Sequence, residues 1–107
     1  IVPNGTDAPV ELVDPRVSLY ASVTRKLPSG DSFFPDQSLS RAEGLLSYTS
    51  WPAFAAFQEK ELGSIEVGKL ADLVCWDTDL LQCPPEKILN ATVLMTWLDG
   101  KQVYPSP

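Results

Sequence analysis

The first half of the chain places apolar residues at helical spacing. Asp14 followed by Pro15 supplies an N-cap acceptor and then a proline at the first helical position, which predicts a helix from Pro15 to Arg25. The apolar residues of this stretch form a wide stripe, so we expect the helix to be covered on more than one side. Before it, the stretch from Ile1 to Leu12 combines a short apolar start with turn residues, which predicts the end of a strand that runs into a loop.

A second helical stretch follows a loop over residues 26–38. In this loop we expect Phe33 and Phe34 to pack onto the body of the protein. Ser40 and Glu43 have the spacing of a capping box and predict a helix start. Pro52 has no N–H to donate within a helix, so this stretch is expected to divide into two short helices near Thr49 to Trp51.

The last third changes from helical to extended patterning. The runs Ala71 to Trp76 and Val93 to Leu98 are nearly continuous in apolar residues, as in strands covered on both faces. Asp99-Gly100 is a hairpin signal that leads into a third strand over residues 101–104. Between the first two strands, residues 86–89 are expected to form one helical turn after Pro84-Pro85. The C-terminal third is therefore predicted to be a small sheet.

Charge and composition exclude several classes of function. The chain of 107 residues has a net charge of −6 and contains no histidine. An acidic chain with scattered cations is a poor nucleic-acid binder, and no apolar run approaches the ~20 residues that would cross a membrane. Without an imidazole, this chain alone forms neither a Ser-His-Asp triad nor most catalytic zinc sites.

The cysteines and asparagines leave some questions open. Cys75 fits a small buried hydrophobic residue and Cys83 a loop thiol, because their spacing matches no C-x-x-C motif. Asn4-Gly5-Thr6 and Asn90-Ala91-Thr92 are sequons that would be glycosylated in a secreted protein. We lean towards a cytoplasmic location and leave secretion open.

Three motifs together resemble a known enzyme family. The run from Glu61 to Asp77 (ELGSIEVGKLADLVCWD) is similar to the GSIE-x-GK-x-AD-L-V signature of amidohydrolases, and residues 93–104 (VLMTWLDGKQVY) resemble the closing hairpin of that family. Upstream, GTDAPV at residues 5–10 resembles a stretch of the family-3 branch, the formamide deformylase-like group. The resemblance extends from Val2 to Tyr104. It identifies the chain as similar to the C-terminal segment of a metal-dependent amidohydrolase.

This resemblance implies a fold and a domain division. The fold class it implies is an α+β fragment, made of the last strand and helices of a (β/α)8 TIM barrel plus C-terminal strands of a composite β-sandwich. Residues 1–60 would be the end of the barrel, and residues 61–107 the sandwich strands and hairpin. Because the chain starts at Ile1 and its first half has no sequence neighbour to cover it, we expect a longer polypeptide with an upstream remainder.

Asp7 is the one candidate catalytic and metal-binding residue. On spacing alone Asp7 fits a turn aspartate that caps the local backbone. The resemblance implies instead that it lies at the end of the eighth barrel strand, where it would bind a divalent metal, with zinc expected, and take a proton from the attacking water. Other carboxylates such as Asp72 and Asp77 are expected to be structural, as are Trp51, Trp76 and Trp97.

Two functions are therefore carried forward. The first is the C-terminal part of a metal-dependent hydrolase that cleaves C–N bonds in a small-molecule amide or formamide, with this chain alone inactive and without bound metal. The alternative is a non-catalytic α+β binding or interaction module derived from the same fold. The partners expected are the upstream remainder of the hydrolase and the amide substrate, with neither nucleic acid nor membrane. The isolated chain is expected to self-associate through uncovered apolar surface.

Overall fold

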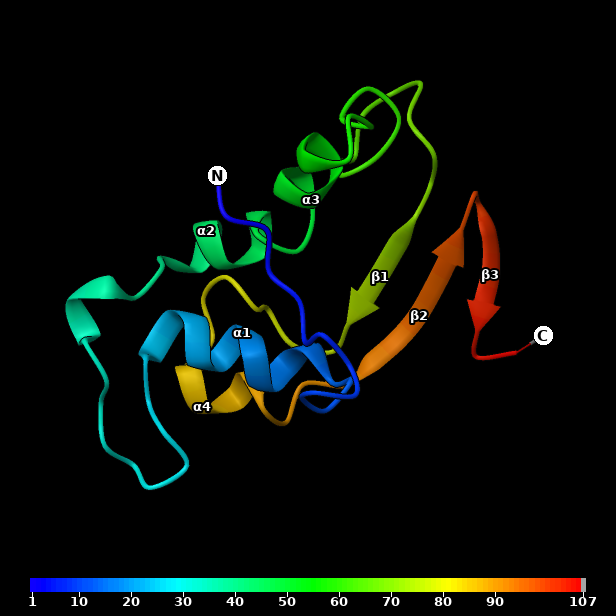
Figure 1. The fold of residues 1–107 in the computed structure, drawn as a ribbon. Coiled ribbons are helices and arrows are strands. Elements are labelled where there is room, and N and C mark those ends of the chain that lie inside the picture. The colour runs from blue at the N-terminus through cyan, green and yellow to red at the C-terminus, as the bar shows by residue number, and fades with distance from the viewer. Residues whose placement is uncertain (107) are drawn as a thin grey trace.

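The computed structural model describes residues 1–106, which form short helices followed by a three-stranded sheet (Figure 1). The elements in chain order are α1 (Pro15–Thr24), the 3-10 helix η1 (Pro35–Gln37), α2 (Arg41–Leu46), α3 (Ser50–Ala55), β1 (Leu73–Trp76), α4 (Pro85–Ile88), β2 (Val93–Leu98) and β3 (Lys101–Tyr104). This order confirms the small α+β architecture. It does not test the TIM barrel or the division at residue 60.

α1 begins and ends where local chemistry places its caps. The Asp14 carboxylate accepts a hydrogen bond from the Arg16 N–H at 3.0 Å, and Pro15 stands at the first helical position. Arg25 adopts a left-handed backbone with φ of 55°, and its N–H donates to the Ala21 carbonyl. Both ends of the predicted helix are therefore confirmed to within one residue.

The second helical stretch divides as predicted. Ser40 and Glu43 form the complete capping box at the start of α2, in which the Ser40 hydroxyl accepts from the Glu43 N–H and the Glu43 carboxylate accepts from the Ser40 N–H. After a break at residues 47–49, α3 begins at Ser50. Pro52 lies in the first turn of α3, where a missing N–H costs no helical hydrogen bond.

The sheet is antiparallel with the order β1-β2-β3. Leu73 pairs with Trp97 across the first ladder, and Leu98 pairs with Lys101 across the second. Between β2 and β3, Asp99 and Gly100 have positive φ values of 49° and 73°, which is the geometry that a type I′ hairpin requires. The predicted strands and hairpin are confirmed.

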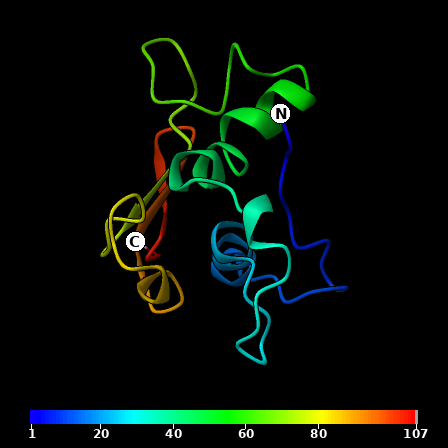
Figure 2. The same cartoon turned by 90° about the vertical axis from the view of Figure 1, so that its left-hand side faces the viewer.

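The core lies between α1, α2 and the segment that contains α4, away from the outer sheet edge. Its buried members are Leu19, Leu80, Ile88 and Ala91, and Tyr20, Val23, Leu45, Tyr48, Trp76 and Cys83 pack against them. Figure 2 shows α4 beside α1, with the sheet beyond them. The core therefore joins the helical first half to the connection between β1 and β2.

The structure corrects three expectations about burial and strands. No strand forms over residues 1–12, because the backbone of this segment makes only one hydrogen bond to a distant part of the described chain, from the Asn4 N–H to the Ser47 carbonyl. Phe33 and Phe34 stack edge-to-face on each other but are 52% and 65% exposed, so they do not pack onto the body. Val17 of α1 is 46% exposed, so that helix is covered on one side rather than on several.

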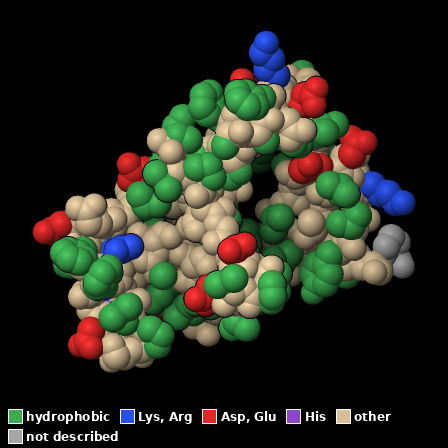
Figure 3. Space-filling model, viewed as in Figure 1, with side chains coloured by type: hydrophobic (Ala, Val, Ile, Leu, Met, Phe, Trp, Pro, Cys, Tyr) green, Lys and Arg blue, Asp and Glu red, His purple; other side chains and the backbone are tan. Residues whose placement is uncertain are grey.

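The sheet also departs from the expectation of strands covered on both faces. Val74 and Leu94 are each about half exposed, whereas their strand neighbours are half-buried. Alternation of this kind belongs to a sheet with one open face. The face of the molecule shown in Figure 3 carries many exposed hydrophobic side chains.

Candidate functional site

Asp7 lies in a tight turn on the surface. Its φ of 48° is in the left-handed region, and its carbonyl accepts a hydrogen bond from the Val10 N–H at 2.8 Å. The Glu11 N–H donates to the Thr6 carbonyl at 3.3 Å and closes the same turn. The side chain of Asp7 is exposed. The turn thus leaves the Asp7 carboxylate accessible. This position agrees both with a structural turn aspartate and with one ligand of a site that residues outside this chain complete.

Asn4 anchors the segment that carries Asp7. Its N–H donates to the carbonyl of buried Ser47 at 2.8 Å, and its side-chain amide donates to the Ser22 hydroxyl at 2.7 Å. Its side-chain oxygen accepts from the Gly5 N–H at 2.9 Å. Asn4 therefore connects the first residues to α1 and to the end of α2. Sequence reasoning missed this role, because Asn4-Gly5 carried only a turn signal.

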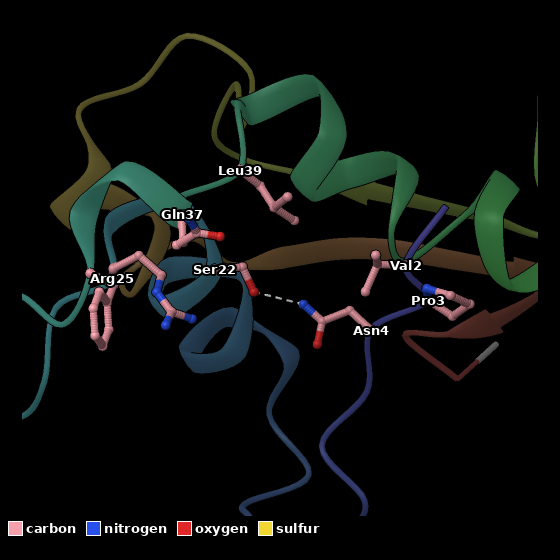
Figure 4. A pocket seen from close by; sticks show the side chains of 8 residues that line it. Val2, Pro3, Asn4, Ser22, Arg25, Gln37 and Leu39 are labelled. Atoms are coloured by element: carbon pink, nitrogen blue, oxygen red, sulfur yellow. Dashed lines mark hydrogen bonds between the residues drawn. The ribbon is translucent and has the colours of Figure 1, made fainter.

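A hollow of about 480 Å³ lies beside this anchor. Its lining residues are Val2, Pro3, Asn4, Ser22, Arg25, Phe34, Gln37 and Leu39. In the close-up, the side chain of Asn4 points at Ser22, and Arg25 and Gln37 lie beyond Ser22 (Figure 4). The Arg25 guanidinium donates to the Phe33 carbonyl and lies 5.4 Å from the centre of the Phe33 ring. Asp7 is not among the lining residues, so this hollow does not include the predicted catalytic carboxylate.

A second hollow of about 430 Å³ lies between the start of α1 and the sheet. Arg16 lines this hollow. Its guanidinium donates to the Ala91 carbonyl at 2.7 Å and pairs with the Asp14 carboxylate at 2.6 Å. The hydrogen bonds from the Arg16 side chain hold the pKa of Asp14 below its usual range. These contacts pair the two charges with each other and give both a structural role within the fold.

Asp72 and Asp77, which could have formed a second carboxylate site, accept hydrogen bonds from backbone N–H groups. Asp77 accepts from the Thr92 N–H at 2.9 Å, and this hydrogen bond is the main cause of the lowered pKa of Asp77. Asp72 accepts from the Asp99 N–H at 2.7 Å and supports the hairpin. The structural interpretation of both residues is confirmed.

The remaining sequence candidates are also structural. Gly63 and Gly68 of the 61–77 motif have positive φ values in the turn-rich connection between α3 and β1. Trp76 packs on the core, while Trp51 and Trp97 are half-buried in different elements. Cys75 is half-buried rather than buried, and Cys83 packs against the core, with both thiols free.

The described residues do not by themselves form a metal centre. Within residues 1–106, no group of three or more His, Cys, Asp or Glu side chains is placed to bind a metal ion. Because the usual catalytic zinc sites take three protein ligands, Asp7 alone does not suffice. In the same described part of the chain, no helix has the length and apolar character needed to span a membrane.

Comparison with known proteins matches the chain to one family. Residues 1–104 match the family described as the amidohydrolase family. The chain is 37% identical to Protein LONG AFTER FAR-RED 3 of Arabidopsis thaliana over 94% of its length, and 35% identical to the N-substituted formamide deformylase of Arthrobacter pascens over 95%. It covers only 17% and 18% of those two proteins.

A solved structure supports the same assignment. The crystal structure of an amidohydrolase from Thermotoga maritima matches 92% of this chain with a TM-score of 0.61 and 25% sequence identity. This chain covers 21% of that structure. The chain therefore belongs to the amidohydrolase family and corresponds to a part of such a protein.

Proposed function

We propose that this chain is the C-terminal part of a metal-dependent hydrolase that acts on the C–N bond of an amide or formamide. The observation that carries the proposal is the family match over residues 1–104, which includes the Asp7 turn, the 61–77 motif and the hairpin in one order. The name of the Arthrobacter pascens relative supports a formamide as the substrate class.

In this proposal Asp7 contributes a carboxylate to a site whose other groups lie elsewhere in the polypeptide. The carboxylate is exposed on a turn that Asn4 ties to α1 and to the end of α2, so the segment that carries it has a defined position. The chemistry proposed for Asp7 is to accept a proton from the attacking water and to return it to the departing amine. The described residues alone do not fit a catalytic metal, so the metal, with zinc expected, needs histidines from outside the chain.

The test uses the complete natural gene product and two matched carboxylate variants. Asp7→Asn is expected to lower kcat/KM for N-substituted formamides and amides by ~10²–10⁴-fold, the usual contribution of a general acid–base group. Glu11→Gln removes another exposed carboxylate of the same turn and is expected to keep wild-type activity. Equal activity of Asp7→Asn and wild type would contradict the role of Asp7.

The alternative function is a non-catalytic binding or interaction module. It is supported by the core that the chain forms from its own residues, with Ile88 and Ala91 fully buried. In that case the complete gene product would hydrolyse none of these amides, and neither variant would change its properties.

The proposed partner is the remainder of the same polypeptide, and the isolated chain is expected to self-associate, which light scattering would detect as more than a monomer.

A further inference from the structure

The two asparagines of this chain both stand in Asn-x-Thr sequons, with Gly5 and Ala91 at the middle positions. The hydrolase proposal gives neither sequon a role. We propose that Asn90 carries an N-linked glycan and that Asn4 does not. The proposal does not depend on the hydrolase function, because it rests on how the fold treats the two side chains.

Asn90 lies at an exposed corner between α4 and β2. Its N–H donates to the Lys87 carbonyl at 3.1 Å and closes the turn at the end of α4. Its side-chain amide makes one contact, with the Glu86 carbonyl, at 3.4 Å. That distance is beyond the usual range for an N–H···O hydrogen bond, so a sugar on this nitrogen would displace little.

The residues after Asn90 fix this corner in place. Ala91 is fully buried, and its carbonyl accepts from the Arg16 side chain at 2.7 Å. Thr92 is held by reciprocal bonds with Asp77, since the Thr92 N–H donates to the Asp77 carboxylate and the Asp77 N–H donates to the Thr92 carbonyl. The backbone is therefore anchored by its neighbours, while the Asn90 side chain projects from the surface.

Asn4 is in the opposite situation. Its side-chain nitrogen donates to the Ser22 hydroxyl at 2.7 Å, and its oxygen accepts from the Gly5 N–H (Figure 4). The residue is half-buried and contacts Ser22 of α1 and Ser47 at the end of α2. A sugar on this nitrogen would crowd the Ser22 hydroxyl and α1, and would disturb the bond that anchors the first residues. Glycosylation of Asn4 therefore competes with a contact that the fold makes, whereas glycosylation of Asn90 does not.

The modification joins the side-chain nitrogen of Asn90 to the anomeric carbon of an oligosaccharide carried on a lipid diphosphate. The new bond is the C–N glycosidic bond, and the bond that breaks joins that carbon to a diphosphate oxygen. The lipid diphosphate leaves with the electron pair, and the amide nitrogen loses one proton. Because such donors face the lumen of the secretory pathway, the proposal places this part of the chain there, against the cytoplasmic location we favoured from the sequence.

The experiment examines the complete natural protein, expressed from its own gene in its source cells. Treatment with peptide N-glycosidase is expected to increase gel mobility by one discrete step. Digestion in ¹⁸O-labelled water is expected to convert Asn90, and not Asn4, to a labelled aspartate, as read by peptide mass spectrometry. An unmodified Asn90 peptide in the wild-type protein, or labelling of Asn4 that requires the glycosidase, would overturn the proposal. A digest without the enzyme measures the spontaneous deamidation of Asn4-Gly5.

Matched variants assign the step to one sequon. Thr92→Ala and Asn90→Gln are each expected to abolish the mobility step, whereas Thr92→Ser keeps a functional sequon and should retain it. Thr6→Ala removes the other sequon and should leave the step unchanged. A step that disappears with Thr6→Ala and persists with Thr92→Ala would contradict the assignment. The wild-type peptide map remains decisive if any variant fails to fold.

Discussion

The region around α1 and α4 and the segment of residues 1–13 are both rich in apolar residues, yet the fold buries only the first. Ile88 and Ala91 are fully buried in the core, whereas Ile1, Val10 and Val13 are 70%, 74% and 80% exposed. The difference teaches that apolar composition alone does not decide burial: within the described residues one small core forms, and residues 1–13 lie outside it. The predicted catalytic carboxylate, Asp7, lies in the uncovered region, which agrees with the proposal that residues outside this chain complete its site.

The largest effect expected on stability comes from removing a core side chain. Ile88→Ala should lower the free energy of unfolding by about 2–5 kcal/mol, because a fully buried isoleucine leaves a cavity in a core with few other members. The control Ile65→Ala removes the same atoms from a side chain that is 87% exposed and should change stability by less than ~0.5 kcal/mol. Denaturant unfolding of the protein that carries this chain measures both, and equal effects would contradict the contrast between the two regions.

A substitution of Arg41 tests whether its hydrogen bonds hold the connection between β1 and β2 against α2. Its guanidinium donates to the Leu80 carbonyl at 2.6 Å and to the Cys83 carbonyl at 2.5 Å. Arg41→Met keeps a similar apolar stem but leaves both carbonyls without this donor, and should cost about 1.5–3 kcal/mol of unfolding free energy. Amide exchange of residues 80–83 should accelerate in the variant. Unchanged exchange there would show that Arg41 does not hold this connection.

A substitution of Gly63 tests the close packing of its backbone against α3, outside the main core. Its φ is +88°, and a Cβ at this position would lie 2.7 Å from the Ala53 Cβ and 3.0 Å from the Thr49 carbonyl oxygen. Gly63→Ala should therefore cost ~1–3 kcal/mol from backbone strain and crowding. The matched variant Gly100→Ala also has positive φ, but its Cβ would be 3.9 Å from the nearest atom, so it should lose less. The difference between their unfolding midpoints checks the crowding; a larger loss for Gly100→Ala would contradict it.

The smallest effect concerns pH and the start of α1. The hydrogen bonds from Arg16 lower the pKa of Asp14 in the folded state. A carboxylate with a depressed folded pKa contributes stability that is present above its unfolded pKa of ~3.9 and is lost as pH falls through the folded value. Asp14→Asn should therefore show a weaker loss of stability below about pH 4 than wild type. Identical acid unfolding curves would mean that this pair contributes nothing.

Local features of the fold were predicted from the sequence, whereas burial was not. Caps and turns are local, so Asp14, the Ser40–Glu43 box and the Asp99-Gly100 hairpin were predicted correctly. Burial is not local. The sequence wrongly placed a strand at the start of the chain, where the described residues offer no partner strand. It also wrongly placed Phe33 and Phe34 against the body of the protein, because an apolar pair in a loop does not specify which surface it packs on.

The candidate site was less predictable than the fold. Asp7 came from resemblance, since its position in a turn carries no catalytic signal of its own. Asn4, which ties that turn to Ser22 and Ser47, was missed because a hydrogen bond over 18 residues leaves no pattern in a single sequence. The division at residue 60 and the role of Asp7 stay predictions.

The most direct test of the central claim is elemental analysis of the complete natural polypeptide beside its Asp7→Asn variant. If Asp7 joins ligands that lie outside this chain, the complete protein should carry a stoichiometric divalent metal and the variant should carry less. The isolated chain of 107 residues should carry none. Full and equal metal content in the complete protein and the variant, or no metal in the gently purified complete protein, would contradict the account.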